Sequence, residues 1–279
     1  MPDAFLAGGS QQWNRAPNET IQQALPIMFY PLYQPKVSLA SGRLIGVEAL
    51  ARKHDPLVGE LLPGVFLPLA TDAQIEAMTF TILRIALADQ ASWKARGHDL
   101  VLSINAPAWL LAAPQTLARL LECVERQGGD PSRLTIEVTE AENPADVPDF
   151  PKVAWRLREH GFGLAIDDFG TGYSSMLSLV SLPFSELKID RAFVHGAADD
   201  DRRMAVLEAS ARLGRQLRMS VTAEGAEDDA DLDAVSAAGC DVVQGYVVAR
   251  PLRAARIHDW PVGTPSCRTR LGAIQQSAT

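Results

Sequence analysis

Oxygen-bearing side chains stand at or near the ends of several short apolar runs in this chain of 279 residues. They are Glu48, Asn105, Glu137, Asp167, Asp168 and Glu224, and Lys188 and Gln244 close two more runs of the same kind. A carboxylate buried in a β-branched run is costly to desolvate unless it meets a positive charge. Oxygen ligands without histidine or thiolate partners are typical of Mg²⁺ or Mn²⁺ sites. If these side chains converge, we expect a site for hard divalent cations.

The elements that must position these residues alternate between short apolar strands and longer amphipathic helices. Strands are expected at Ile27–Val37, Leu44–Ala51, Leu100–Asn105, Leu134–Thr139, Leu164–Asp168, Glu186–Asp190, Met219–Glu224 and Val242–Tyr246. Helices are expected at Ala73–Arg96, Ala113–Gln127, Val147–His160, Arg202–Arg215 and Asp229–Ala238, with shorter ones near Ser174 and Arg253. Eight strands with helices between them indicate a (β/α) barrel rather than an open sheet. Ala40-Ser41-Gly42 is typical of a hairpin turn, so one strand is expected to run antiparallel to the rest.

In such a barrel the polar strand ends meet at one rim, which is the usual place for the active site. Asp167 and Asp168 need a further feature, because neighbours on an extended strand point to opposite faces. We therefore expect the chain to leave the strand there, through the turn Phe169-Gly170-Thr171-Gly172. A shared carboxylate could then bridge two ions, which lie about 3.5–4 Å apart in two-metal sites. Two such ions favour phosphate-ester hydrolysis, with Lys188 holding the attacking water or the developing charge.

Taken singly, these residues could also have ordinary structural roles. Glu48 and Glu137 could be salt-bridged strand residues, and Lys188 could extend from a strand end to solvent. Asn105 could cap the helix after Pro107. Glu227 is expected to begin a helix with Asp228 and Asp229. The joint occurrence over so many strands favours one site.

Composition also bears on the partners and the cellular location of the protein. A net charge of −8 without a basic stripe argues against DNA or RNA polymers as partners. No apolar run approaches the roughly 20 residues that span a bilayer, so no membrane association is expected. Cys123, Cys240 and Cys267 are widely spaced, which is typical of a reducing cytoplasm. We expect a flexible leader at residues 1–20, one barrel at 21–267 and a flexible tail at 268–279.

The chain resembles the EAL-domain cyclic-di-GMP phosphodiesterases over roughly residues 28–253. The motifs that carry the resemblance are Tyr33-Gln34-Pro35-Lys36-Val37, Glu48-Ala49-Leu50, Ile136-Glu137-Val138-Thr139-Glu140, Asp167-Asp168-Phe169-Gly170-Thr171-Gly172, Leu187-Lys188-Ile189-Asp190, Ala223-Glu224-Gly225-Ala226-Glu227 and Gln244-Gly245-Tyr246. The resemblance implies a modified TIM (β/α)₈ barrel with one antiparallel strand. It also implies hydrolysis of cyclic di-GMP to linear pGpG with two Mg²⁺ or Mn²⁺ ions.

The resemblance further implies roles for single residues. Glu48, Asn105, Glu137, Asp167, Asp168 and Glu224 would bind the metals, and Lys188, Gln244, Glu48 and Glu224 would form the catalytic set. Gln34, Leu50, Arg52 and Asp190 would contact the substrate. Glu140, Thr171 and Ser174 would anchor the loop Phe169–Ser175, which in this family links the metal site to a dimer interface. A homodimer and a regulatory protein partner are therefore expected.

Departures from the family pattern are few. Ala106-Pro107 follows Asn105, where the proline could shift that ligand's backbone, and Lys53 stands where Trp is common. Two other functions stay open. One is a receptor that binds the dinucleotide without cleaving it, although such family members usually lose metal ligands and this chain keeps them. The other is a Mg²⁺-dependent barrel enzyme of the enolase type.

Overall fold

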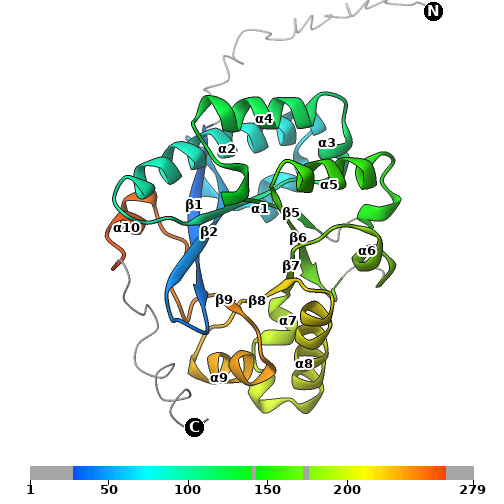
Figure 1. The fold of residues 1–279 in the computed structure, drawn as a ribbon. Coiled ribbons are helices and arrows are strands. Elements are labelled where there is room, and N and C mark those ends of the chain that lie inside the picture. Colours follow the sequence, from blue (N-terminus) through cyan, green and yellow to red (C-terminus); the bar gives the residue numbers. More distant parts are fainter. Residues whose placement is uncertain (1–27, 140–142, 172–175, 262–279) are drawn as a thin grey trace, which may run out of the picture.

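The computed structural model describes residues 28–139, 143–171 and 176–261, which form a closed barrel surrounded by helices (Figure 1). Its strands are β1 Met28–Ser38, β2 Leu44–Asp55, β3 Gly59–Leu61, β4 Val101–Asn105, β5 Leu134–Thr139, β6 Gly163–Phe169, β7 Glu186–Ile189, β8 Ser220–Glu224 and β9 Val242–Gln244. The sheet order is β1-β9-β8-β7-β6-β5-β4-β2-β3, and a pairing of β1 with β2 closes the ring. The expected modified TIM barrel is confirmed.

Strand β1 runs antiparallel to both of its neighbours, β2 and β9. The other pairings around the ring are parallel. The single antiparallel strand of the ring is thus the one that the hairpin turn at Ala40–Gly42 predicted. Strand β2 continues four residues beyond the expected end at Ala51 and forms a second hairpin with β3. Asp55 makes this turn, because its Oδ1 accepts hydrogen bonds from the backbone of Leu57 and Val58.

Helices cover the outside of the ring, with α2 and α4 on one side and α8 and α9 on the opposite side (Figure 1). The helices are α1 Pro63–Phe66, α2 Asp72–Lys94, α3 Ala108–Ala112, α4 Thr116–Arg126, α5 Phe150–Glu159, α6 Met176–Ser181, α7 Arg191–Val194, α8 Asp201–Gln216, α9 Asp229–Ala238 and α10 Ala254–His258. In the part of the chain that the structure describes, no helix combines the length and apolarity needed to cross a membrane.

Three short helices, α1, α3 and α7, were not predicted, and two helices begin later than predicted. The helix expected from Ala113 begins at Thr116, because Gln115 takes a left-handed φ of 71° that separates it from α3. The helix expected from Val147 begins at Phe150, after Asp149 with a φ of 62°. The domain boundaries expected at residues 20/21 and 267/268 lie outside the described residues.

The strands divide their side chains between two environments with a period of two residues. Val47, Ile104, Ile136, Ile166 and Ile189 are buried in the hydrophobic core. The alternate positions on the same strands carry Glu48, Asn105, Glu137, Asp167 and Lys188. Alternate residues along each strand therefore build the hydrophobic core, and the residues between them bring polar groups into the ring.

A substitution at Gly46 tests how tightly β2 packs against β4 in the ring. A Cβ at this buried position on β2 would lie 2.7 Å from the backbone oxygen of Val101 on β4. We expect Gly46→Ala to lower the free energy of unfolding by about 1–3 kcal/mol through overpacking. Gly64→Ala is the matched control, because a Cβ there meets nothing within 4 Å. Urea unfolding measures both variants, and equal midpoints would contradict the expectation.

Candidate functional site

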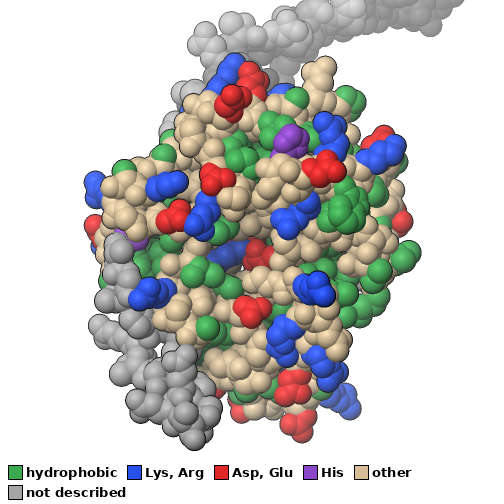
Figure 2. Space-filling view, viewed as in Figure 1, with side chains coloured by type: hydrophobic (Ala, Val, Ile, Leu, Met, Phe, Trp, Pro, Cys, Tyr) green, Lys and Arg blue, Asp and Glu red, His purple; other side chains and the backbone are tan. Residues whose placement is uncertain are grey.

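A cavity of about 670 Å³ opens at the C-terminal ends of the parallel strands. In Figure 2 acidic and basic side chains are visible in the hollow near the centre of the face. The predicted residues that line it are Gln34, Glu48, Leu50, Arg52, Asn105, Asp167, Asp168, Lys188, Glu224 and Gln244. Of the other predicted ligands, Glu137 is fully buried beside this set. The strand-end pattern therefore identified one contiguous site.

Lys188 lies at the centre of the site and is only 1% exposed, so it does not extend to solvent. Its Nζ lies 2.5 Å from Glu137 Oε2, 2.7 Å from Asp167 Oδ1, 2.8 Å from Glu224 Oε1 and 3.3 Å from Glu48 Oε2. An ammonium has three N–H donors, so it cannot donate a separate hydrogen bond to each of four carboxylates. The cluster holds more acceptors and more negative charge than Lys188 satisfies.

Glu48 is held from two further strands. Gln244 Nε2 donates to its Oε2 at 2.5 Å, and Asn105 Nδ2 donates to its Oε1 at 2.7 Å. Asn105 therefore does not cap the next helix, whose N-cap is Pro107. The backbone N–H of Ala106 donates to Glu137 O at 3.0 Å, so β4 and β5 stay paired despite the following proline.

A β-bulge brings Asp167 and Asp168 to the same site. As expected, the chain leaves the strand directly after this pair: β6 ends at Phe169, and the backbone N–H of Thr171 donates to Asp168 O in the turn that follows. The register between β6 and β7 also shifts between Ile166 and Phe169. Asp168 takes a left-handed φ of 54°, which breaks the alternation of the two side chains. Backbone strain of this kind is often found at functional sites.

The loop after β6 is described only in part. Thr171 donates from its backbone N–H and its Oγ1 to Asp168 O, at 3.2 and 3.0 Å, which supports its predicted anchoring role. Glu140 and Ser174, the other two predicted anchors, lie outside the described residues.

The predicted substrate contacts divide into two groups. Gln34, Leu50 and Arg52 line the cavity, and the Arg52 Nε makes no hydrogen bond although it is buried. Asp190 does not line the cavity. Its Oδ1 accepts from the backbone of Ala192 at 2.8 Å and caps α7. A substrate role for Asp190 stays a prediction.

Sequence reasoning missed Arg191, Glu227 and Tyr246, which also line the cavity. Arg191 and Glu227 form an ion pair at 2.7 Å. Helix α9 begins at Asp229 with Asp228 as its cap, so Glu227 precedes the helix and belongs to the cavity wall. The available signal was proximity along the chain, because Glu227 follows Glu224 by three residues.

Burial and neighbouring charges shift the pKa values of the carboxylates in this cluster in opposite directions. Burial, and then the neighbouring Glu137, raise the pKa of Glu48 to about 7. Burial and Asp167 raise the pKa of Glu224 well above its usual range, against the opposing effect of Lys188. Burial acts on Glu137 in the same direction, but Lys188 and Lys36 together lower its pKa to about 2. The repulsion between these acids favours binding of a further cation.

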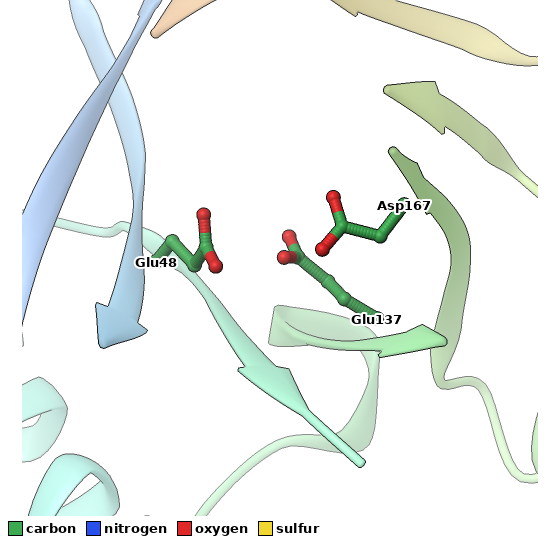
Figure 3. Close-up of side chains that lie close together, drawn as sticks. All are labelled: Glu48, Glu137 and Asp167. Atoms are coloured by element: carbon green, nitrogen blue, oxygen red, sulfur yellow. The ribbon is translucent and has the colours of Figure 1, made fainter. Parts of the chain in front are cut away.

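The donor set fits hard divalent cations in two overlapping groups. Glu48, Glu137 and Asp167 form the first, and Asp167, Asp168 and Glu224 form the second, with oxygen atoms within 4.8 Å of one another in each. Figure 3 shows the first group converging from three strands. The Gln244 Oε1 is buried in this region without a hydrogen-bond partner. Carboxylate and amide oxygens without nitrogen or sulfur donors suit Mg²⁺, Mn²⁺ or Ca²⁺.

Comparison with known proteins identifies the family. The family model described as "EAL domain" matches residues 18–251. The chain belongs to the EAL domain family. Among curated relatives, it is similar to the oxygen sensor protein DosP of Escherichia coli strain K12, with 37% identity over 231 residues, 82% of this chain and 29% of the relative. It is also similar to the cyclic di-GMP phosphodiesterase PA2567 of Pseudomonas aeruginosa, with 36% identity over 233 residues, 83% of this chain and 40% of the relative.

A solved EAL structure supports the same assignment. The PaMucR phosphodiesterase in complex with c-di-GMP has a TM-score of 0.76 and 37% identity, and the match covers 82% of this chain and 94% of that one. The chain spans less than half the length of the two curated relatives.

Glu48 makes stability and metal binding depend on pH. Its pKa is about 7 in the folded protein and 4.5 ordinarily. Below pH 4.5 this difference favours the folded state, and the advantage is lost as the pH rises through about 7. The free energy of unfolding falls by on the order of 3 kcal/mol over this pH range. Because a divalent cation binds the ionised carboxylate, we expect Mg²⁺ to raise the melting temperature more at pH 8 than at pH 6.

Scanning calorimetry of the chelator-treated protein, with and without Mg²⁺, measures this difference. Glu48→Gln is the control that should weaken the pH dependence. An identical Mg²⁺ effect at both pH values would show that ionisation of Glu48 does not control binding, and no effect at either would show that this cluster does not bind the cation.

Proposed function

We propose that this EAL domain is a metal-dependent phosphodiesterase that hydrolyses cyclic di-GMP to linear 5′-pGpG. The observation that carries the proposal is the convergence of Glu48, Asn105, Glu137, Asp167, Asp168 and Glu224 from five strands around Lys188. The names of the relatives support it, because they include a cyclic di-GMP phosphodiesterase and a complex with c-di-GMP. The complete ligand set favours an enzyme over a receptor that only binds the nucleotide.

We further propose two Mg²⁺ or Mn²⁺ ions, held by the two acidic groups that share Asp167. Bound divalent cations supply charge neutralisation for a phosphoryl group and lower the pKa of water. The chain contributes the positions of the groups around them. Gln244 and Asn105 fix both oxygens of Glu48 by hydrogen bonds.

Burial and neighbouring acids raise the pKa values of Glu48 and Glu224 when no cation is bound, so a bound divalent cation would displace their protons and ionise both. We propose that these two carboxylates take part in catalysis through the cations that they would hold. Lys188 lies between these two groups and carries a positive charge that its acidic neighbours stabilise. It can therefore stabilise the negative charge that develops on the phosphate.

The cavity wall suits a nucleotide. Its volume of about 670 Å³ falls in the range of small-ligand sites. Arg52 lines this cavity, and its buried Nε makes no hydrogen bond and lies 3.7 Å from Glu60 Oε1. Guanidinium groups have five N–H donors and bind phosphate oxygens well. Gln34 is fixed by a hydrogen bond from its Nε2 to Ala249 O at 2.8 Å. We propose that Arg52 binds a phosphate and that Gln34 and Leu50 contact the rest of the substrate.

Lys188→Ala tests the chemistry directly. We expect kcat for release of pGpG to fall about 10²–10³-fold, as for removal of one transition-state charge partner. Calorimetric Mg²⁺ binding should persist, because the carboxylates remain and lose a competing cation. Chromatography of the products from wild type and variant provides the measurement.

Two results would contradict the proposal. One is wild-type protein that forms no pGpG with Mg²⁺. The other is nucleotide binding without turnover that Asp168→Asn leaves unchanged, which would favour the receptor.

We also propose a homodimer formed through α6. Met176, Leu177 and Val180 are at least 62% exposed on this short helix, and it follows the loop after β6. Such an exposed apolar group is typical of an interface. A regulatory protein partner could bind the same surface.

We also propose a cytoplasmic location. The described cysteines, Cys123 and Cys240, are free thiols, which supports it.

Introducing charge on the exposed face of α6 tests the dimer. We expect Leu177→Glu with Val180→Glu to convert a dimer into a monomer, because the buried carboxylates would be desolvated without partners. Val206→Glu on α8 is the control, since Val206 is also exposed but lies on another helix. Sedimentation equilibrium gives the masses, and a monomeric wild type would refute this interface.

A further inference from the structure

A second polar layer lies below the metal-binding residues inside the ring. The two-residue period places Ser103 below Asn105, Glu186 below Lys188 and Thr222 below Glu224. Lys36 enters the same layer from β1. Because β1 is antiparallel, Lys36 lies deeper in the ring than Gln34, which precedes it by two residues and lines the cavity.

Lys36 is fixed by three contacts in this layer and is 4% exposed. Its Nζ lies 2.7 Å from Glu137 Oε1, 2.9 Å from Ser103 Oγ and 3.0 Å from Glu186 Oε1. These contacts use the three N–H donors of the ammonium. Thr222 Oγ1 also donates to Glu186 Oε1 at 2.6 Å. The ammonium of Lys36 therefore has a complete set of partners below the cavity.

The two oxygens of Glu137 consequently have different surroundings. Oε1 is bound to Lys36, whereas Oε2 lies 2.5 Å from Lys188 Nζ, which also contacts Glu48 and Asp167. Oε2 is thus the oxygen on the side of the acidic cluster. Figure 3 shows the Glu137 carboxylate between those of Glu48 and Asp167.

We propose that Lys36 is a positioning residue for the metal site, because it holds Oε1 of Glu137 so that Glu137 binds a divalent cation through Oε2 alone. This inference rests on the metal dependence of the proposed function. The contact with Lys36 fixes the orientation of the Glu137 carboxylate. Without this contact, the carboxylate could rotate or bind a cation through both oxygens. Partners that orient a metal ligand commonly affect metal affinity by about 10–100-fold.

A purely structural role for Lys36 makes a different prediction. Lys36 also pairs with Glu186, so its loss could weaken the barrel by leaving that carboxylate buried without a cation. Glu186 does not line the cavity, so its charge can be removed without touching the metal ligands. Combining each Lys36 variant with Glu186→Gln therefore separates charge balance from positioning.

The experiment measures Mg²⁺ and Mn²⁺ affinity by isothermal titration calorimetry on the full chain without nucleotide. Glu186→Gln is the matched control and should bind within about twofold of wild type. Lys36→Met/Glu186→Gln should bind about 10–100-fold more weakly than wild type, whose net charge it keeps, and more weakly than this control although it lacks the competing charge of Lys36. Lys36→Gln/Glu186→Gln keeps an uncharged donor toward Glu137 and should lie between that variant and the control, at least about threefold weaker than the control, because a neutral donor holds a carboxylate less strongly than an ammonium does. Thermal unfolding in chelator records stability separately.

Affinity within twofold of the control in either folded Lys36 variant would overturn the proposal, even if its melting temperature fell. If Lys36→Met/Glu186→Gln does not fold, Lys36→Gln/Glu186→Gln decides by the same criterion. Because no nucleotide is used, the result does not depend on whether cyclic di-GMP is cleaved. A wild type that binds the metals but releases no pGpG would refute the proposed function and leave the role of Lys36 supported.

Discussion

Electrostatic repulsion among buried carboxylates is the constraint on which the site depends. Glu48, Glu137, Asp167 and Glu224 all contact one ammonium, that of Lys188, at the mouth of the barrel. Each carboxylate that loses water must regain its solvation from positive charge or hydrogen bonds. One lysine does not supply enough for four, and burial together with the neighbouring acids raises the pKa of Glu48 and of Glu224. We propose that divalent cations relieve this repulsion in the place where a phosphodiester would be cleaved.

The barrel makes such a concentration of charge possible. The seven strands that run parallel around the ring direct their ends to one rim, and the period of two keeps polar groups inside while apolar groups pack against the helices. The antiparallel β1 has a separate effect. Its direction places Gln34 at the rim and Lys36 below it, so a second lysine reaches the underside of Glu137. Lys188 and Lys36 together lower the pKa of Glu137, whereas burial raises the pKa values of Glu48 and Glu224.

The residues at the rim could be predicted from sequence because each ends an apolar run, and a barrel brings such ends together. The first strand's direction was also predictable from the turn at Ala40–Gly42. The bulge at Asp168 was not, because it depends on the register between β6 and β7 rather than on local sequence. Lys36 was missed for a similar reason. Its partners Ser103, Glu137 and Glu186 are 67 to 150 residues away in the chain, so only the closed ring shows that they meet. Arg191 and Glu227 look like ordinary surface charges in the sequence, and only the structure shows that they pair at the cavity wall.

An anomalous difference map from crystals grown with Mn²⁺ shows directly whether these oxygen atoms from separate strands share divalent cations. We expect two peaks, one bounded by Glu48, Glu137 and Asp167 and one bounded by Asp167, Asp168 and Glu224. A map without a peak in contact with these carboxylates, at a Mn²⁺ concentration that supports activity, would contradict this expectation.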